Sequence, residues 1–173
     1  MALTVEDGSI VAGADAYVSV LATDTYNTNY VGDVSWATAT EAQKELAIRK
    51  ATQYLDATYF LMWRGERVNN LQVLQWPREG ACYDDGIAID SDEIPNPLKL
   101  ATMELAIKAN AQTDPLVVDV DAPAANIKRS RVKAGPVEEE NEYFGGNTNQ
   151  KQYTIVSQMV LPLIAGFGEV SRA

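Results

Sequence analysis

The chain has no histidine and only one cysteine, Cys82, among its 173 residues. Without histidine it lacks the usual general base at neutral pH, the serine–histidine and cysteine–histidine pairs, and the commonest metal ligand. A single cysteine cannot form an intramolecular disulfide, which favours a reducing, cytoplasmic setting and an inert thiol. We therefore expect a protein that is not an enzyme and that carries no cofactor and no catalytic or metal-binding residues.

Two further kinds of signal are missing. The sequence has no glycine-rich phosphate-binding loop and no nucleophile elbow, so neither nucleotide nor acyl chemistry has a signature. The longest apolar stretch, near Val160, is broken by Pro162 and Gly166, and the first residues lack a basic and apolar leader pattern. These absences predict a soluble protein with no membrane partner.

Basic residues are also scarce relative to acidic ones. The chain has 24 acidic and 14 basic residues, a net charge of -10, and a pI near 4.4. Because phosphate contacts are made mainly by clustered lysine and arginine, this balance makes naked DNA a poor primary partner. The apolar content of 46% is enough for one buried core, which predicts a single domain over residues 1–173.

Apolar residues recur at helical spacing in several parts of the chain. Thr38 or Thr40 caps the clearest helix, with Glu41 or Gln43 placed to complete a capping box. We predict helices over residues 19–30, 40–58, 97–111 and 153–164, and a short one over 70–75. The predicted structural core includes Tyr54, Leu55, Trp63, Trp76, Pro77 and Leu105.

The segment between the two central helices carries a Trp76-Pro77 anchor and a turn signal at Asp85-Gly86. Trp63, Trp76 and Arg78 could form a ligand pocket, but core packing is the stronger interpretation for large aromatics beside a proline. We predict that this segment connects the helices 40–58 and 97–111 into a rigid bundle.

A basic strand and an acidic strand follow a linker at 114–126, and a flexible loop is expected at 144–150. Together they predict a β-hairpin over residues 127–143 with opposite charges across from each other. The candidate interface residues are Lys128, Arg129, Arg131, Lys133, Glu138, Glu139, Glu140 and Glu142. The basic run could instead touch phosphates, but it lacks the interleaved aromatics that stack single-stranded bases, so a protein neighbour is favoured.

Acidic side chains gather in one further place. Their oxygens would suit a hard cation such as calcium, but their spacing does not match a calcium-binding loop. A solvated turn followed by a helix N-terminus is the favoured interpretation. The residues are Asp84, Asp85, Asp90, Asp92 and Glu93.

Six short stretches follow one another in a characteristic order. They are Ala14-Asp15-Ala16-Tyr17-Val18-Ser19-Val20, Arg49-Lys50-Ala51-Thr52-Gln53-Tyr54-Leu55-Asp56, Trp63-Arg64-Gly65-Glu66-Arg67-Val68, Gln75-Trp76-Pro77-Arg78, Ile94-Pro95-Asn96-Pro97-Leu98-Lys99-Leu100-Ala101 and the stretch 132–143. In this order, over about residues 3–165, the chain resembles small virion proteins of tailed bacteriophages. These head–tail adaptors, also called connector or head-completion proteins, have relatives often labelled DnaT-like single-stranded DNA-binding proteins.

The resemblance implies a mainly α fold: a small helical bundle, about residues 19–111 and 153–165, with a protruding β-hairpin and extended terminal arms that include residues 1–13. It also implies a ring of twelve copies beneath the portal protein, connecting the capsid to a tail, tail-terminator or nozzle protein. DNA would pass through the channel without specific binding, and the protein would reside in the virion after assembly in the host cytoplasm. The alternative function is a single-stranded nucleic-acid-binding accessory protein that uses the basic strand.

Overall fold

The computed structural model describes residues 2–111, 116, 129–134, 137–142 and 153–165. The chain divides into two compact units, Met1–Thr113 with Tyr153–Ala173, and Asp114–Gln152. We call the first unit the body and the second the arm. The described residues are mainly helical with a small antiparallel hairpin, which confirms the predicted fold class in outline. That the two units serve as one functional domain stays a prediction.

Helix α3, Glu41–Thr58, begins where its capping signal predicts. Thr40 accepts a hydrogen bond from the backbone N–H of Gln43, and the Gln43 side chain accepts one from the backbone N–H of Thr40 at 2.9 Å. This reciprocal pairing satisfies two N–H groups that a helix end otherwise leaves unpaired. The face that α3 turns to the core is formed by small and branched residues, Ala47, Ile48, Ala51, Thr52 and Leu55.

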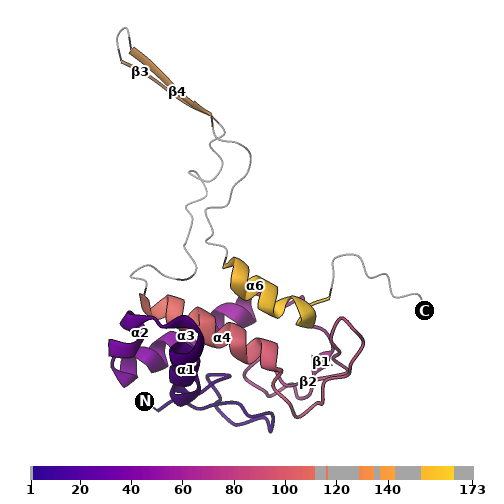
Figure 1. Ribbon diagram of the computed structural model, residues 1–173. Coiled ribbons are helices and arrows are strands. Elements are labelled where there is room, and N and C mark those ends of the chain that lie inside the picture. The colour runs from indigo at the N-terminus through magenta and orange to yellow at the C-terminus, as the bar shows by residue number, and fades with distance from the viewer. Residues whose placement is uncertain (1, 112–115, 117–128, 135–136, 143–152, 166–173) are drawn as a thin grey trace, which may run out of the picture. The chain divides into compact units, whose positions relative to one another are not determined.

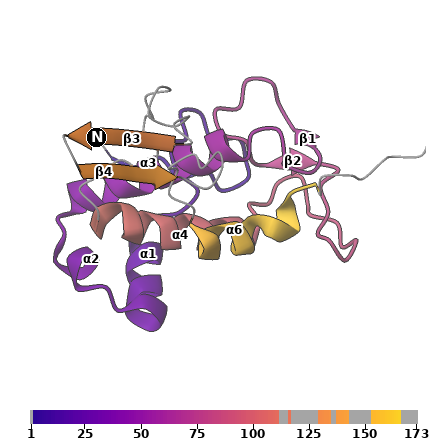
Figure 2. The ribbon, with the colours of Figure 1, turned by 90° about the horizontal axis from the view of Figure 1, so that it is seen from above.

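Helix α4, Asn96–Ala111, is the centre of the body (Figures 1 and 2). It packs against α3 and also against α6, Thr154–Val160, and the following 3₁₀ turn η2, Leu161–Leu163. The predicted helices 40–58, 97–111 and 153–164 are therefore confirmed. Helix α4 is enclosed on nearly all sides: its buried residues are Leu98, Ala101, Thr102, Met103, Glu104, Leu105, Ala106, Ile107 and Ala109.

The first predicted helix changes character partway along. Helix α1 covers Val20–Tyr26, and the next five residues, Asn27–Val31, form the π-helical turn η1. Gly32 then reverses the chain at φ 70° and leads into α2, Val34–Thr38, which the sequence did not predict. Because α2 buries Trp36 completely, this short helix contributes one of the largest side chains of the core.

The N-terminal segment folds onto the body, so the prediction of an extended arm over residues 1–13 is wrong for the described residues 2–13. Val5 bridges Ala16, and the Glu6 carboxylate is buried. That carboxylate accepts hydrogen bonds from the backbone N–H groups of Gly8, Ile10 and Val11 at 2.9–3.0 Å. These hydrogen bonds fix the conformation of the loop after Glu6, because one carboxylate satisfies three backbone donors.

The segment between α3 and α4 is held by hydrogen bonds, with two short paired strands, β1 (Glu66–Arg67) and β2 (Arg78–Glu79). The helix predicted over 70–75 is wrong. The Gln72 side chain donates to the backbone carbonyls of Leu74 and Pro77, so side-chain bonds replace the helical ones. The predicted turn at Asp85-Gly86 is confirmed by the hydrogen bond from the Gly86 N–H to the Tyr83 carbonyl.

The predicted core is confirmed with one correction. Leu55, Trp63, Trp76, Pro77 and Leu105 are buried, and the two tryptophan rings meet edge to face at 5.9 Å. Tyr54 is only half-buried, because its ring lies at the surface end of the core and contacts the ring of Tyr153. The segment around Trp76 therefore fills the space beside α3 and α4, as a rigid connection between them requires.

Candidate functional site

The arm contains a two-stranded antiparallel ribbon, β3 (Arg129–Ala134) paired with β4 (Val137–Glu142), which confirms the predicted hairpin. Its register places Arg129 opposite Glu142, Arg131 opposite Glu140, and Lys133 opposite Glu138. Because alternate residues of a strand share a face, these six positions lie on one face of the ribbon. Every basic position in that face has an acidic position directly across from it.

The other face of the ribbon carries a different set of residues. It pairs Ser130 with Asn141, Val132 with Glu139, and Ala134 with Val137. Among the predicted interface residues, Glu139 is therefore separated from the other six, while Lys128 lies outside the described residues. The ribbon has one charge-paired face and one face of mostly small or uncharged residues.

The body offers little basic surface. Residues 2–111 contain sixteen acidic and eight basic side chains. Lys44, Arg49, Arg64 and Lys108 form ion pairs with carboxylates, and Arg78 is buried with its guanidinium bonded to backbone carbonyls. A run of phosphates would find no continuous basic track over these residues, because four of the eight cations are already paired with carboxylates and Arg78 is buried.

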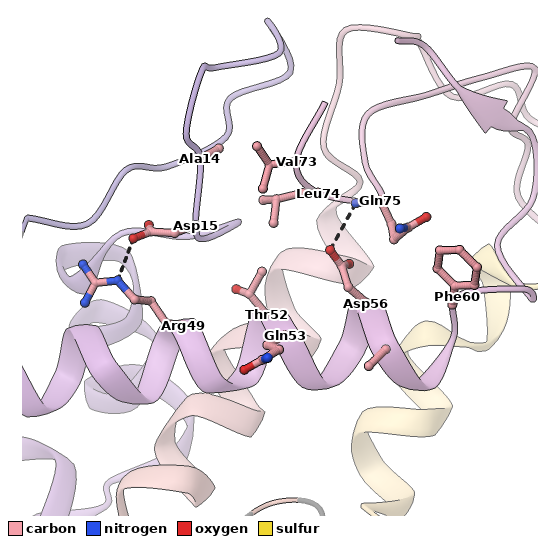
Figure 3. A pocket seen from close by; sticks show the side chains of 11 residues that line it. Ala14, Asp15, Arg49, Thr52, Gln53, Asp56, Phe60, Val73, Leu74 and Gln75 are labelled. Atoms are coloured by element: carbon pink, nitrogen blue, oxygen red, sulfur yellow. Dashed lines mark hydrogen bonds and ion pairs between the residues drawn. The ribbon is translucent and has the colours of Figure 1, made fainter. Parts of the chain in front are cut away.

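The body also has a groove along α3, facing the segment 73–75 and the N-terminal segment (Figure 3). Its volume is about 470 Å³. Phe60 and Val73 lie at its rim, 55% and 61% exposed. The full lining comprises Ala14, Asp15, Arg49, Thr52, Gln53, Asp56, Ala57, Phe60, Val73, Leu74 and Gln75.

A hydrogen-bond network at Asp56 forms the floor of the groove. The Tyr17 hydroxyl donates to Asp56 Oδ1 at 2.6 Å, and the backbone N–H of Gln75 donates to Asp56 Oδ2 at 3.1 Å. The same hydroxyl accepts from the N–H groups of Gln75 and Trp76. This network ties the N-terminal segment, α3 and the Trp76 segment together at one point.

The charge of Asp56 has no ion-pair partner among the residues that the structure describes. Burial raises the pKa of Asp56 to about 6, while the hydrogen bonds from Tyr17 and Gln75 and the more distant charge of Arg78 act in the opposite direction. At the other end of the groove, by contrast, Asp15 is paired with Arg49 at 2.6 Å. Thr52, which lines the groove, is 1% exposed, and its hydroxyl has no hydrogen-bond partner among the described residues.

The other candidate residues from the sequence have structural roles or form no site in the described part of the chain. Trp63 and Trp76 are core residues, as favoured, and Arg78 donates to the carbonyls of Arg64, Gly65 and Gln75. The Cys82 thiol lies 3.8 Å from a guanidinium nitrogen of Arg64, a cation that the sequence did not place there. Within the described part of the chain, no group of three or more metal-ligating side chains comes together.

Sequence reasoning missed the groove. Tyr17 and Asp56 are separated by 39 residues, and Asp56 and Gln75 by 19. Each of the three stands inside a motif quoted for the phage resemblance, but nothing local marks them as neighbours. A polar Asp56 in an otherwise apolar position at the end of α3 is the one signal that could have drawn attention to the site.

These features define a mainly helical protein with an acidic body and a charge-paired ribbon. The chain belongs to the family described as "Putative DnaT-like ssDNA binding protein", whose model matches residues 1–173. No curated protein and no solved structure matches it. The family's description agrees with the label of the predicted relatives, and it fits the alternative function, nucleic-acid binding, better than the adaptor role.

No helix in the described ranges is long and apolar enough to cross a membrane.

Proposed function

We propose that this chain is a structural virion protein, a head–tail adaptor that assembles into a ring of twelve copies beneath the portal of a tailed phage. The observation that carries the proposal is the ribbon register, which sets three basic positions against three acidic ones. A surface with balanced, alternating charge selects a protein partner and its register. Phosphate binding would favour an excess of cations instead.

The architecture of the ribbon supports assembly. A two-stranded ribbon is marginal in water unless it packs on something, and both of its edges offer unpaired backbone groups. Its second face, with Val132, Ala134 and Val137, has little charge to lose on burial. A neighbouring copy, the portal or a tail protein would supply the missing contacts.

The charge of the body supports a role around DNA without adhesion to it. Residues 2–111 carry a net charge of -8, from sixteen acidic and eight basic side chains. Because nonspecific DNA affinity comes from phosphate contacts, an acidic ring lumen lets the genome slide through. The proposed location is the head–tail interface, after assembly in the host cytoplasm.

The test is a mass measurement of the purified chain alone and with the portal ring of the same phage, by native mass spectrometry. A closed ring of the chain, or a portal complex with twelve copies, is expected. A chain that stays monomeric under both conditions overturns the proposal. Electron microscopy of the assembled product provides the independent count of subunits.

Single-stranded DNA binding is the second candidate, favoured by the family's description and by the basic strand β3. Three or four phosphate contacts predict that the logarithm of the affinity falls with the logarithm of salt concentration at a slope of roughly -2 to -3. Fluorescence anisotropy with a labelled oligonucleotide measures this slope. Tight, steeply salt-dependent binding that is lost when Arg129, Arg131 and Lys133 are changed to glutamine would favour this function over the adaptor.

A further inference from the structure

The groove along α3 combines an apolar lining with polar side chains from α3 (Figure 3). Its volume, about 470 Å³, falls within the range of roughly 300–1,000 Å³ typical of ligand sites. Two polar groups on its α3 wall are incompletely matched. The Thr52 hydroxyl is buried without a partner, and the Asp56 carboxylate has hydrogen bonds but no ion-pair partner in the described part of the chain.

The Thr52 hydroxyl and the Asp56 carboxylate indicate the chemistry of a matching ligand. A carboxylate withdrawn from water is stabilised by a cation that arrives with donors of its own, and an arginine or lysine side chain is such a ligand. Nearby Arg78 does not fill this role, because its guanidinium donates to the carbonyls of Arg64, Gly65 and Gln75. Asp15, the other carboxylate of the groove, is already paired with Arg49.

The rim of the groove fits the stem of such a side chain. Phe60 and Val73 are more than half exposed, and the buried Leu74 also lines the groove. Lysine and arginine bury their methylene groups along apolar surface while the charged end reaches a polar site. A cation on a long aliphatic stem therefore matches both the rim and the floor.

The chain itself contains a segment with this chemistry. Strand β3 places Arg129, Arg131 and Lys133 at alternate positions, which is the densest set of basic residues in the described sequence. Each has a glutamate across the ribbon, but a cross-strand pair contributes only about 0.2–1 kcal/mol, so a cation can exchange it for a more buried partner. The described ribbon carries three basic and four acidic residues, so the attraction is local, between one cation of β3 and the Asp56 carboxylate.

We propose that the groove is the socket for strand β3 of a second copy, with the cationic end of Arg129, Arg131 or Lys133 placed at the Asp56 carboxylate. The inference rests on the proposed self-assembly and gives it a specific contact. Because the groove is on the body and the strand is on the arm, the contact joins two different surfaces. Contacts of this head-to-tail type generate rings when the rotation between copies closes.

The test uses two full-length variants. In the socket variant, D56N combined with V73K, the floor loses its charge and the exposed rim gains a cation. In the strand variant, R129Q, R131Q and K133Q remove the proposed ligands and leave the groove intact. L21K is the matched control for the socket variant, because Leu21 is 76% exposed on α1 and does not line the groove.

Neither variant is expected to form rings by itself. The apparent dissociation constant for association between copies of the chain should rise at least tenfold, both in the absence of the portal ring and in its presence. The mixture is expected to form one-to-one dimers that grow no further, since only one intact socket meets one intact strand. Native mass spectrometry distinguishes these species by mass. L21K should assemble like the wild type, and circular dichroism of all variants should show the wild-type fold.

The outcomes separate this inference from the proposed function. If the wild type forms rings and the socket variant forms them equally well, the socket is wrong and the adaptor proposal stands. If the mixture gives no dimer while both variants fail alone, the pairing of socket with strand is wrong. A wild-type chain that never assembles, even with the portal, overturns both proposals.

Discussion

The hydroxyl of Tyr17 lies 2.6 Å from Oδ1 of Asp56 and acts in three hydrogen bonds at once. It donates to the carboxylate and accepts from the backbone N–H groups of Gln75 and Trp76. One buried oxygen thus joins three segments that are distant in the sequence. We therefore expect this oxygen to contribute to the stability of the body.

Replacing Tyr17 by phenylalanine should lower the free energy of unfolding by about 1–3 kcal/mol, because the Trp76 N–H then loses its acceptor in a buried site. Urea denaturation followed by tryptophan fluorescence measures the change. Tyr30→Phe is the control, since Tyr30 is 78% exposed. Equal stability of the two variants would show that the hydroxyl contributes nothing.

The contribution of Asp56 to the stability of the body should fall as the pH rises from about 4 to about 6. The pKa of Asp56 is raised from 3.8 to about 6 in the folded chain, mainly by burial, so the folded state holds a proton that the unfolded state has released. This contribution is fully present below pH 3.8 and is lost as the pH passes the folded value.

The difference between the two pKa values corresponds to roughly 3 kcal/mol. Denaturation curves at a series of pH values measure the dependence, and D56N should flatten it between pH 4 and 6, because the asparagine does not titrate. A wild-type profile that D56N leaves unchanged in this window would assign the dependence to another group.

Gly8→Ala should destabilise the body by roughly 2–4 kcal/mol. Gly8 has φ +111°, and a Cβ there would lie 1.8 Å from the carbonyl oxygen of Asp92. Gly13→Ala is the matched control, because Gly13 also has a positive φ but no atom within 4 Å of the added Cβ. Thermal unfolding should separate the two, and similar losses would mean that backbone strain alone, and no clash with Asp92, sets the cost.

Exchanging one charge in the ribbon should weaken it, and exchanging both should restore it. Arg131→Glu places two glutamates opposite each other, which costs up to about 1 kcal/mol in cross-strand energy. Adding Glu140→Arg recreates the opposite pair with the signs reversed. Amide hydrogen exchange of β3 and β4 should be faster in the single variant and return to the wild-type rate in the double variant.

The control for the ribbon experiment is Glu139→Arg combined with Arg131→Glu. Glu139 lies opposite Val132 on the other face, so this second change should not rescue the single variant. Rescue by Glu139→Arg that equals rescue by Glu140→Arg would mean that net charge, and not the register, governs the ribbon.

The parts of the fold that the sequence predicts are those with local signals. Thr40 and Gln43 mark the start of α3, and apolar spacing marks α4 and α6. Opposite charges on either side of a turn mark the ribbon. In each case the residues that decide the structure are close in sequence, so propensity and pattern suffice.

The parts that the sequence did not predict depend on distant contacts. Trp36 is fixed by a hydrogen bond from its indole N–H to Asp24 and by the ammonium group of Lys44 over its ring. Residues 70–75 have helical character but are held as a loop by Gln72 and by the network at Asp56. The groove exists only because these tertiary contacts form, and no local pattern encodes them.

The enclosure of α4 has a consequence for how this family diversifies. A helix buried on nearly all sides accepts few changes of volume, because each altered methyl group is felt by neighbours on every side. Related chains should therefore keep small and branched apolar residues at the positions of Ala101, Leu105 and Ala106. Changes that adapt relatives to new partners should accumulate instead at the groove rim and on the ribbon.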